Sequence, residues 1–151
     1  MNNSKAPTRQ EEQLAWHYTI SDRAKYIVES KFIYAATAGV PAGERPCIWF
    51  SLEQFWEPTA NKAESSPSGH MRKLNFEEMV SLGLWRFGLP VAMLLDWRQL
   101  KRETRMSRKV AKGLVSAARS QGSNPELWYG AMKPVPVDDC VVQRLIDGEW
   151  S

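Results

Sequence analysis

The sequence is poor in the residues that build metal centres and disulfide frameworks. Its 151 residues include two cysteines, Cys47 and Cys140, and two histidines, His17 and His70. No Cys-x-x-Cys pair occurs, and neither cysteine has a histidine near it in the sequence. We therefore expect neither a metal site nor a structural disulfide.

Long apolar runs and glycine-rich loops are also missing. No stretch approaches the roughly 20 apolar residues that a membrane helix needs, and residues 1–12 lack the apolar core of a signal peptide. Neither spacing of the common phosphate-binding glycine loops is present, and there is no Gly-x-Ser-x-Gly elbow. These absences argue against a Rossmann, P-loop or α/β-hydrolase enzyme and predict a cytoplasmic protein with no membrane partner.

The length and the 43% content of hydrophobic residues predict one globular domain. Residues 1–12 are polar and show no periodicity, so we expect a flexible tail followed by a single domain over residues 13–151. Short helices and scattered strands, without regular alternation of the two, predict a mixed α+β fold.

Local signals place the expected elements. Strand-like stretches lie at 14–20, 32–34, 47–51, 84–87, 126–129 and 137–146. Helices are expected at 22–30 with Ser21 as N-cap, from Asn75, and after Ser107 up to Gly122. The last of these helices should bury Val110, Ala111, Leu114, Ala117 and Ala118. The Pro, Ser and Gly content of residues 57–73 predicts a mobile loop with an idle His70.

The stretch from Leu14 to Ile20 holds His17 in an apolar and aromatic setting. An alternating strand would place Leu14, Trp16, Tyr18 and Ile20 on one face. His17 and Thr19 would then share the other face, which either meets solvent or lines a cleft. A histidine satisfied by the backbone is the structural alternative to a ligand-binding role.

Positive charge is concentrated between residues 98 and 119, where eight Lys and Arg residues are opposed only by Glu103. Such a run attracts phosphate groups. The candidate phosphate or nucleic-acid contacts are Arg102, Arg105, Lys109 and Lys112. The alternative is the solvated face of one or two helices.

Three stretches carry a resemblance to a known family: Trp16-His17-Tyr18-Thr19, residues 44–51 with the sequence Glu-Arg-Pro-Cys-Ile-Trp-Phe-Ser, and Trp56-Glu57-Pro58-Thr59-Ala60. Together they resemble small bacterial proteins with an ADP-ribosyltransferase-like fold. The resemblance implies a split antiparallel sheet with short flanking helices, whose cleft holds NAD as a substrate. No metal is implied.

The same resemblance implies roles for individual residues. His17 would hydrogen-bond a ribose or the nicotinamide amide, Ser51 would support the site, and aromatic side chains would stack on nicotinamide. The implied NAD-binding residues are His17, Tyr18, Thr19, Tyr34, Trp49, Phe50 and Ser51, with Tyr26 as a further stacking candidate. Glu126 ranks first and Glu57 second as the catalytic carboxylate, ahead of Glu44.

A carboxylate beside the ribose would stabilise the oxocarbenium-like transition state that forms when nicotinamide leaves. Each glutamate also has a structural alternative: Glu57 as a cap or partner near Trp56, and Glu126 as an exposed strand start. The sequence thus predicts an NAD-binding ADP-ribosyltransferase-like protein that, if active, transfers ADP-ribose to a protein or nucleic acid. The alternatives are a non-enzymatic module that binds nucleic acid or protein through residues 98–119, and a degenerate transferase fold that serves as an interaction surface.

Overall fold

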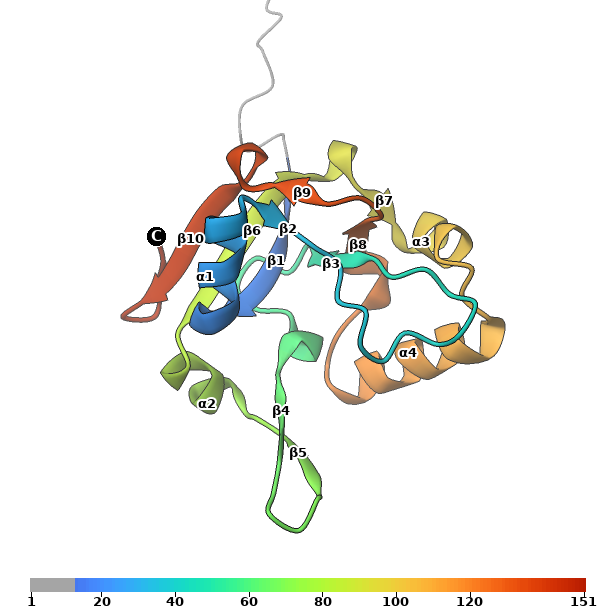
Figure 1. Cartoon of the computed structure of the whole chain (residues 1–151), viewed down its shortest axis with the longest axis horizontal. Helices are drawn as coiled ribbons and strands as arrows, with labels where there is room; N and C mark the ends of the chain where they lie inside the picture. Colours follow the sequence, from blue (N-terminus) through green and yellow to red (C-terminus); the bar gives the residue numbers. More distant parts are fainter. Residues whose placement is uncertain (1–12) are drawn as a thin grey trace, which may run out of the picture.

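A computed structural model describes residues 13–151 of the chain, and the predicted tail at residues 1–12 lies outside the described part. Its centre is a seven-stranded sheet in the order β11-β10-β6-β1-β3-β8-β7, in which every neighbouring pair is antiparallel (Figure 1). In chain order these strands are β1 Leu14–Ile20, β3 Ile48–Ser51, β6 Leu84–Pro90, β7 Leu95–Asp96, β8 Trp128–Ala131, β10 Val141–Ile146 and β11 Glu149–Trp150.

Within residues 13–151, two small sheets and four α-helices surround this sheet. The small sheets pair β2 Phe32–Ile33 with β9 Val135–Pro136, and β4 Ala63–Ser65 with β5 Met71–Lys73. The helices are α1 Ser21–Ser30, α2 Phe76–Ser81, α3 Trp97–Glu103 and α4 Arg108–Ser120. Short 3₁₀ turns occur at Pro58–Ala60, Val91–Met93, Pro125–Leu127 and Val137–Asp139. The predicted α+β class is confirmed.

Strand β1 lies near the middle of the sheet and is buried on both faces. It pairs with β6 along its whole length, from Leu14↔Pro90 to Ile20↔Leu84. Its register with β3 consists of one pair, Trp16↔Ser51, so the two strands part beyond that point. On the face that His17 and Thr19 share, which was expected to meet solvent or line a cleft, Ala15 is fully buried and Thr19 is 4% exposed.

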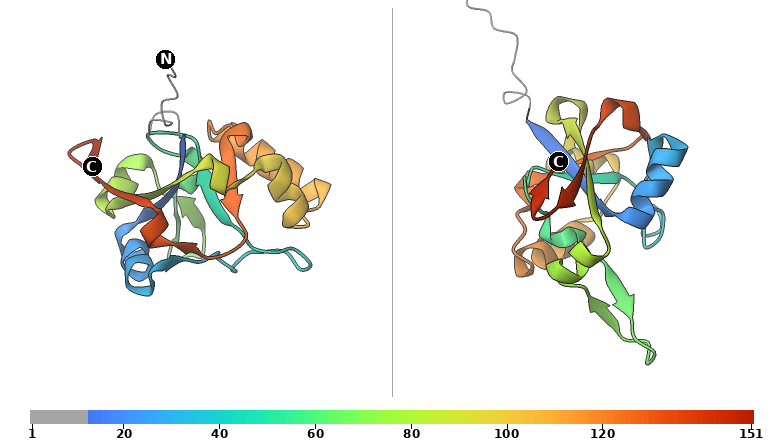
Figure 2. Two further views of the ribbon diagram at one scale, coloured as in Figure 1. Left: turned by 90° about the horizontal axis from the view of Figure 1, so that it is seen from above. Right: turned by 90° about the vertical axis from the view of Figure 1, so that its left-hand side faces the viewer.

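The two faces of the sheet bury separate groups of side chains. On the first, Ala24 of α1, Ile33 of β2 and Val135 of β9 pack on Phe50 and Phe87 of the sheet. On the second, Leu74 and Met79 pack on Leu84, with Trp56 and Trp150 at the margin. Figure 2 shows that the β4–β5 hairpin projects away from this body, while α3 and α4 lie together at the far end from α1.

Helix ends follow local rules. Asn75 and Glu78 form a capping box at the start of α2, as do Asp96 and Gln99 at the start of α3. The predicted end signals of the last helix are confirmed, because the Ser107 side chain accepts from the backbone N–H of Val110 and Gly122 has a φ of 81°. None of the helices within residues 13–151 is long and apolar enough to span a bilayer.

Several local expectations were wrong, including the strand expected at 137–146, which begins at Val141 after a 3₁₀ turn. Ser21 is the first helical residue and not the N-cap; its hydroxyl accepts from the indole N–H of Trp85. The predicted mobile loop at 57–73 contains a 3₁₀ turn and the β4–β5 hairpin, where Arg72 pairs with Glu64 and Glu78.

On α4, Ala118 is buried as expected and Leu114 is half-buried. Ala117 is exposed, because the helix packs over a narrow strip of its surface. Glu126 lies in a 3₁₀ turn, and the strand predicted to begin there begins at Trp128.

Candidate functional site

A cavity of about 450 Å³ opens beside the point where β1 and β3 part. Its walls come from β1, α1, β2, the segment that follows β2, and the start of β3, together with Lys62. Four of the seven predicted NAD-binding residues line it: His17, Thr19, Tyr34 and Trp49. We call this cavity the His17 cleft; its volume lies within the range of small-molecule sites.

His17 is fixed by its contact with β3. Its Nδ1 lies 2.8 Å from the backbone carbonyl oxygen of Trp49. Because a carbonyl only accepts, Nδ1 of a neutral ring must carry the proton, which leaves Nε2 as an acceptor on a ring that lines the cleft. Burial lowers the pKa of His17 below its ordinary value of 6.5, more than the bond to Trp49 raises it, and the charge of Lys62 lowers it further. The histidine is therefore neutral at pH 7.

A lowered histidine pKa makes folding stability depend on pH. Below about pH 6.5 the unfolded chain binds a proton at His17 that the folded chain does not, so we expect stability to fall as the pH drops through this window. The slope from one such group cannot exceed about 1.4 kcal/mol per pH unit. Urea unfolding between pH 5 and pH 7 should show this slope in the wild type and a smaller one in His17→Asn, whose amide can still donate to Trp49. An equal slope in both would contradict the assignment.

The cleft also carries two cations that sequence reasoning missed, Arg23 and Lys62. Burial and the charge of Arg23 lower the pKa of Lys62. Tyr26 and Tyr34 lie at the exposed rim, and the Trp49 ring packs at 5.7 Å edge-on against Trp128. Aromatic faces with nearby cations suit a ligand that has planar rings and phosphates.

The remaining three predicted NAD-binding residues do not line the cleft. Tyr18 extends from the opposite face of β1, where its hydroxyl donates to the Glu53 carbonyl, its ring packs on Trp56 at 5.0 Å, and burial raises its pKa to about 12. Phe50 is buried in the core with its ring 5.7 Å from that of His17. Ser51 donates to Glu57.

Glu57 is a buried carboxylate whose oxygens are fully engaged. Oε1 accepts from the Ser51 hydroxyl at 3.0 Å and lies 3.3 Å from the indole N–H of Trp128. Oε2 accepts from the backbone N–H and the hydroxyl of Thr59, at 2.9 and 2.6 Å, and from the Ser123 hydroxyl at 2.8 Å. The carboxylate thus ties β3, β8, the turn at Pro58 and the end of α4 together.

Glu126 is exposed and does not line the cleft. Its backbone N–H donates to the Asn124 side chain, and the turn that carries it meets the Ser51 end of β3 through the Leu52–Leu127 hydrogen bond. The cleft lies at the other end of β3, beside Trp49. Neither candidate glutamate therefore shares the cleft with His17.

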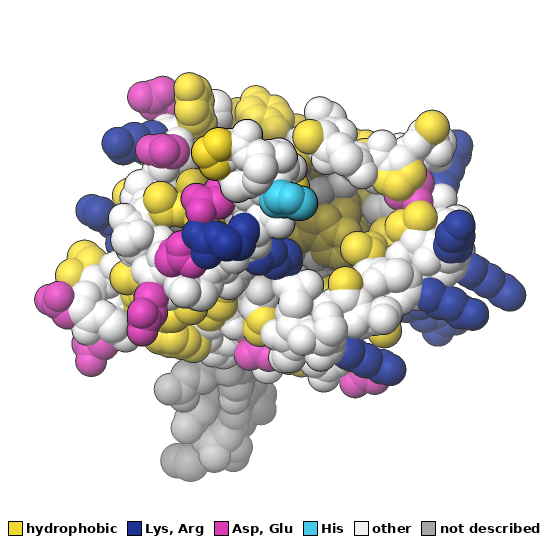
Figure 3. Space-filling model, turned by 90° about the horizontal axis from the view of Figure 1, so that it is seen from below, with side chains coloured by type: hydrophobic (Ala, Val, Ile, Leu, Met, Phe, Trp, Pro, Cys, Tyr) yellow, Lys and Arg dark blue, Asp and Glu magenta, His cyan; other side chains and the backbone are white. Residues whose placement is uncertain are grey.

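Two of the four candidate phosphate contacts line a cavity, and the other two do not. Arg102 and Lys112 line a cavity between α3 and α4, whereas Arg105 and Lys109 are exposed outside it. In Figure 3, Lys and Arg side chains gather at the right edge, where α3 and α4 lie, and acidic side chains are concentrated on the other side. Positions 98, 101 and 102 follow helical spacing, a signal that could have identified Arg98 and Lys101 from sequence.

Among residues 13–151, no group of His, Cys, Asp and Glu side chains is arranged to hold a metal ion. Comparison with protein-family models, with curated protein sequences and with solved structures yields no match to this chain.

Proposed function

We propose that this protein binds NAD in the His17 cleft. The main support for the proposal is that one cavity is lined by residues from three separate segments of the chain: His17, Thr19, Tyr34 and Trp49. The neutral His17 ring offers Nε2 as an acceptor for a ribose hydroxyl. Arg23 and Lys62 supply positive charge for the pyrophosphate, and Tyr34 and Trp49 supply aromatic faces for the rings.

The proposal is limited to binding. Transfer of ADP-ribose needs a carboxylate next to the ribose that loses nicotinamide. Glu57 is held by four neighbouring residues away from the cleft, and Glu126 lies at the other end of β3. These positions favour a transferase-like domain that holds NAD over one that transfers ADP-ribose.

Titration calorimetry with NAD tests the proposal. We expect His17→Phe, which keeps an aromatic ring but removes the acceptor, to weaken binding by about 5- to 30-fold, as loss of one hydrogen bond of roughly 1–2 kcal/mol requires. Tyr18→Phe is the matched control. It removes a polar group from the neighbouring residue, on the face of β1 that does not line the cleft, and should leave NAD affinity unchanged.

A second comparison separates the phosphate contacts from the rest of the site. The double substitution Arg23→Ala with Lys62→Ala should weaken NAD binding more than adenosine binding, because only NAD carries phosphates. Wild-type protein that does not bind NAD at millimolar concentration would overturn the proposal. Equal losses of NAD affinity in Tyr18→Phe and His17→Phe would show that NAD binds outside the His17 cleft.

A further inference from the structure

The surface between α3 and α4 is a basic groove, separate from the His17 cleft. Two adjoining cavities of about 580 and 390 Å³ lie along it and share Lys101, Ala111 and Lys112 in their walls. The cations that line the two cavities are Arg98, Lys101, Arg102, Arg108, Lys112 and Arg119. We call this surface the α3–α4 groove.

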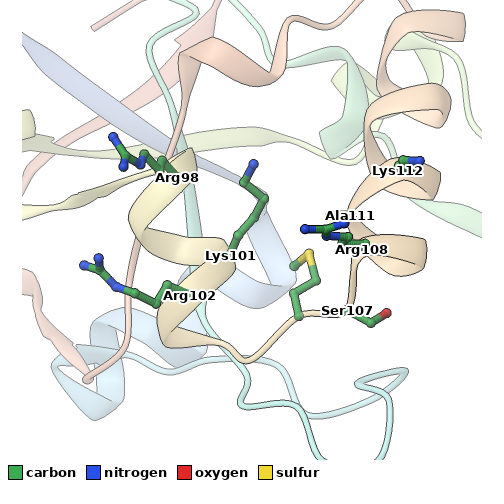
Figure 4. Close-up of a pocket in the computed structure, with 8 residues that line it drawn as sticks. Arg98, Lys101, Arg102, Ser107, Arg108, Ala111 and Lys112 are labelled. Atoms are coloured by element: carbon green, nitrogen blue, oxygen red, sulfur yellow. The ribbon is translucent and has the colours of Figure 1, made fainter.

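Helical spacing aligns these cations in two opposing rows. Arg98, Lys101 and Arg102 stand at i, i+3 and i+4 on α3, and Arg108 and Lys112 at i and i+4 on α4. Figure 4 shows Arg108 reaching from α4 toward Lys101 on α3. From Arg108 to Arg119 the helix rises about 16 Å, so the cations of α4 extend over several backbone phosphates.

Little within the described part of the chain neutralises this charge. Of the six groove cations, only Arg102 forms an ion pair within residues 13–151, an exposed contact of 3.7 Å with Glu103. No carboxylate lines either cavity. Closely spaced and unpaired cations raise the local concentration of polyanions, so the groove is suited to a ligand that carries several phosphates.

The groove also has an apolar floor, which distinguishes it from a solvated helix face. Trp97, Ala111 and Val115 line the smaller cavity, and the Trp97 ring is held edge-on to Trp128 at 5.2 Å. Lys101 Nζ lies 5.3 Å from the Trp97 ring, so a cation and an aromatic surface adjoin. A fixed aromatic ring can stack on a nucleobase only where the base is unpaired, which favours a single strand over a duplex.

We propose that the α3–α4 groove binds single-stranded nucleic acid, with the two rows of cations on the phosphates and Trp97 against a base. No residue lines both the groove and the His17 cleft, so the inference does not rest on NAD binding. The two sites adjoin, because the ring of Trp49 in the cleft lies 6.1 Å from the ring of Trp97 in the groove.

Fluorescence anisotropy with a labelled oligothymidylate of about 12 nucleotides tests the proposal. We expect the four substitutions Lys101→Ala, Arg102→Ala, Arg108→Ala and Lys112→Ala together to weaken binding at low salt by at least about tenfold. The log–log dependence of affinity on salt should flatten by about 3, since each phosphate contact with a single strand contributes about 0.7. The matched control removes four exposed cations that line neither cavity, with Lys25→Ala, Arg45→Ala, Lys109→Ala and Lys133→Ala, and should change affinity about twofold or less.

Three outcomes would overturn the inference. Equal losses in the groove variant and the control would show that net charge alone drives binding. With the wild type, equal affinity for a duplex of the same length would rule out the stacking contact, and equal affinity for polyglutamate would show that the groove takes any polyanion. The wild-type measurements do not depend on whether a variant folds.

Discussion

Glu57→Ala should reduce the free energy of unfolding by about 4 kcal/mol, because it removes the acceptor that donors from four other segments share, three of them buried. Glu57 is 6% exposed, and after truncation the hydroxyls of Ser51 and Ser123 and the indole N–H of Trp128 would face a cavity. Each buried donor left unpaired costs about 1–3 kcal/mol. Urea unfolding followed by tryptophan fluorescence measures the loss.

The unfolding free energies of two further variants test whether the loss comes from the missing acceptor of Glu57. Glu57→Gln keeps one acceptor oxygen but turns an NH₂ group toward the same donors, so we expect an intermediate loss of about 2 kcal/mol. Glu126→Ala, at an exposed carboxylate with no side-chain hydrogen bond in the described structure, should stay within about 0.5 kcal/mol of the wild type. A loss below about 1 kcal/mol in Glu57→Ala would contradict a structural role for this residue.

Glu57 also shows why the site could be predicted only in part from sequence. Its partners Ser51, Ser123 and Trp128 stand 6, 66 and 71 residues away, and nothing in the local sequence marks them as one cluster. The carboxylate was identified as a candidate through a resemblance, which cannot report the face of the sheet on which it lies. In the structure Glu57 is buried among hydroxyl groups and an indole, which favours a structural role over a catalytic one.

Elements with local signals could be predicted more closely. The Ser107 cap, the amphipathic spacing and Gly122 set the limits of α4, and the run of strand-forming residues sets β1. Helix α3 was missed although Asp96 and Gln99 stand at the spacing of a capping box, a local signal that is visible in the sequence. A basic segment was predicted from the sequence, but which of its cations line the groove depends on how α3 packs against α4.

A second buried polar centre lies on the same face of the sheet as Glu57. Arg86 of β6 is 7% exposed, and its guanidinium carbon lies 3.7 Å from the centre of the Trp16 ring and 4.5 Å from that of Trp150. Its Nε and Nη2 donate to Gln143 Oε1 at 2.9 and 2.6 Å, and Nη1 donates to the Gln54 carbonyl. No carboxylate pairs with it within residues 13–151.

Trp16 can stack on Arg86 because the neighbouring position on that face has no side chain. A Cβ atom at Gly88 would lie 2.7 Å from the Trp16 ring, so only glycine leaves room for the indole. The guanidinium therefore links β1, β6, β10 and β11 through two aromatic rings and one glutamine. The planar fork of arginine makes these contacts at once, which a lysine ammonium cannot do.

Arg86→Ala should therefore cost about 4 kcal/mol of unfolding free energy, from two desolvated cation–π contacts of about 2 kcal/mol each and two acceptors left unpaired, partly offset by the removal of a buried charge. Arg144→Ala is the matched control, since Arg144 lies on the adjacent strand β10 with one cation–π contact, 4.9 Å from the centre of the Trp85 ring, and is exposed. That variant should lose no more than about 1 kcal/mol.

Arg86→Lys should lose nearly as much as Arg86→Ala, because a single ammonium cannot stack between both indoles and donate to both acceptors. Thermal and urea unfolding of the three variants would decide the matter, and equal stabilities for Arg86→Ala and Arg144→Ala would show that the buried guanidinium adds nothing to the fold.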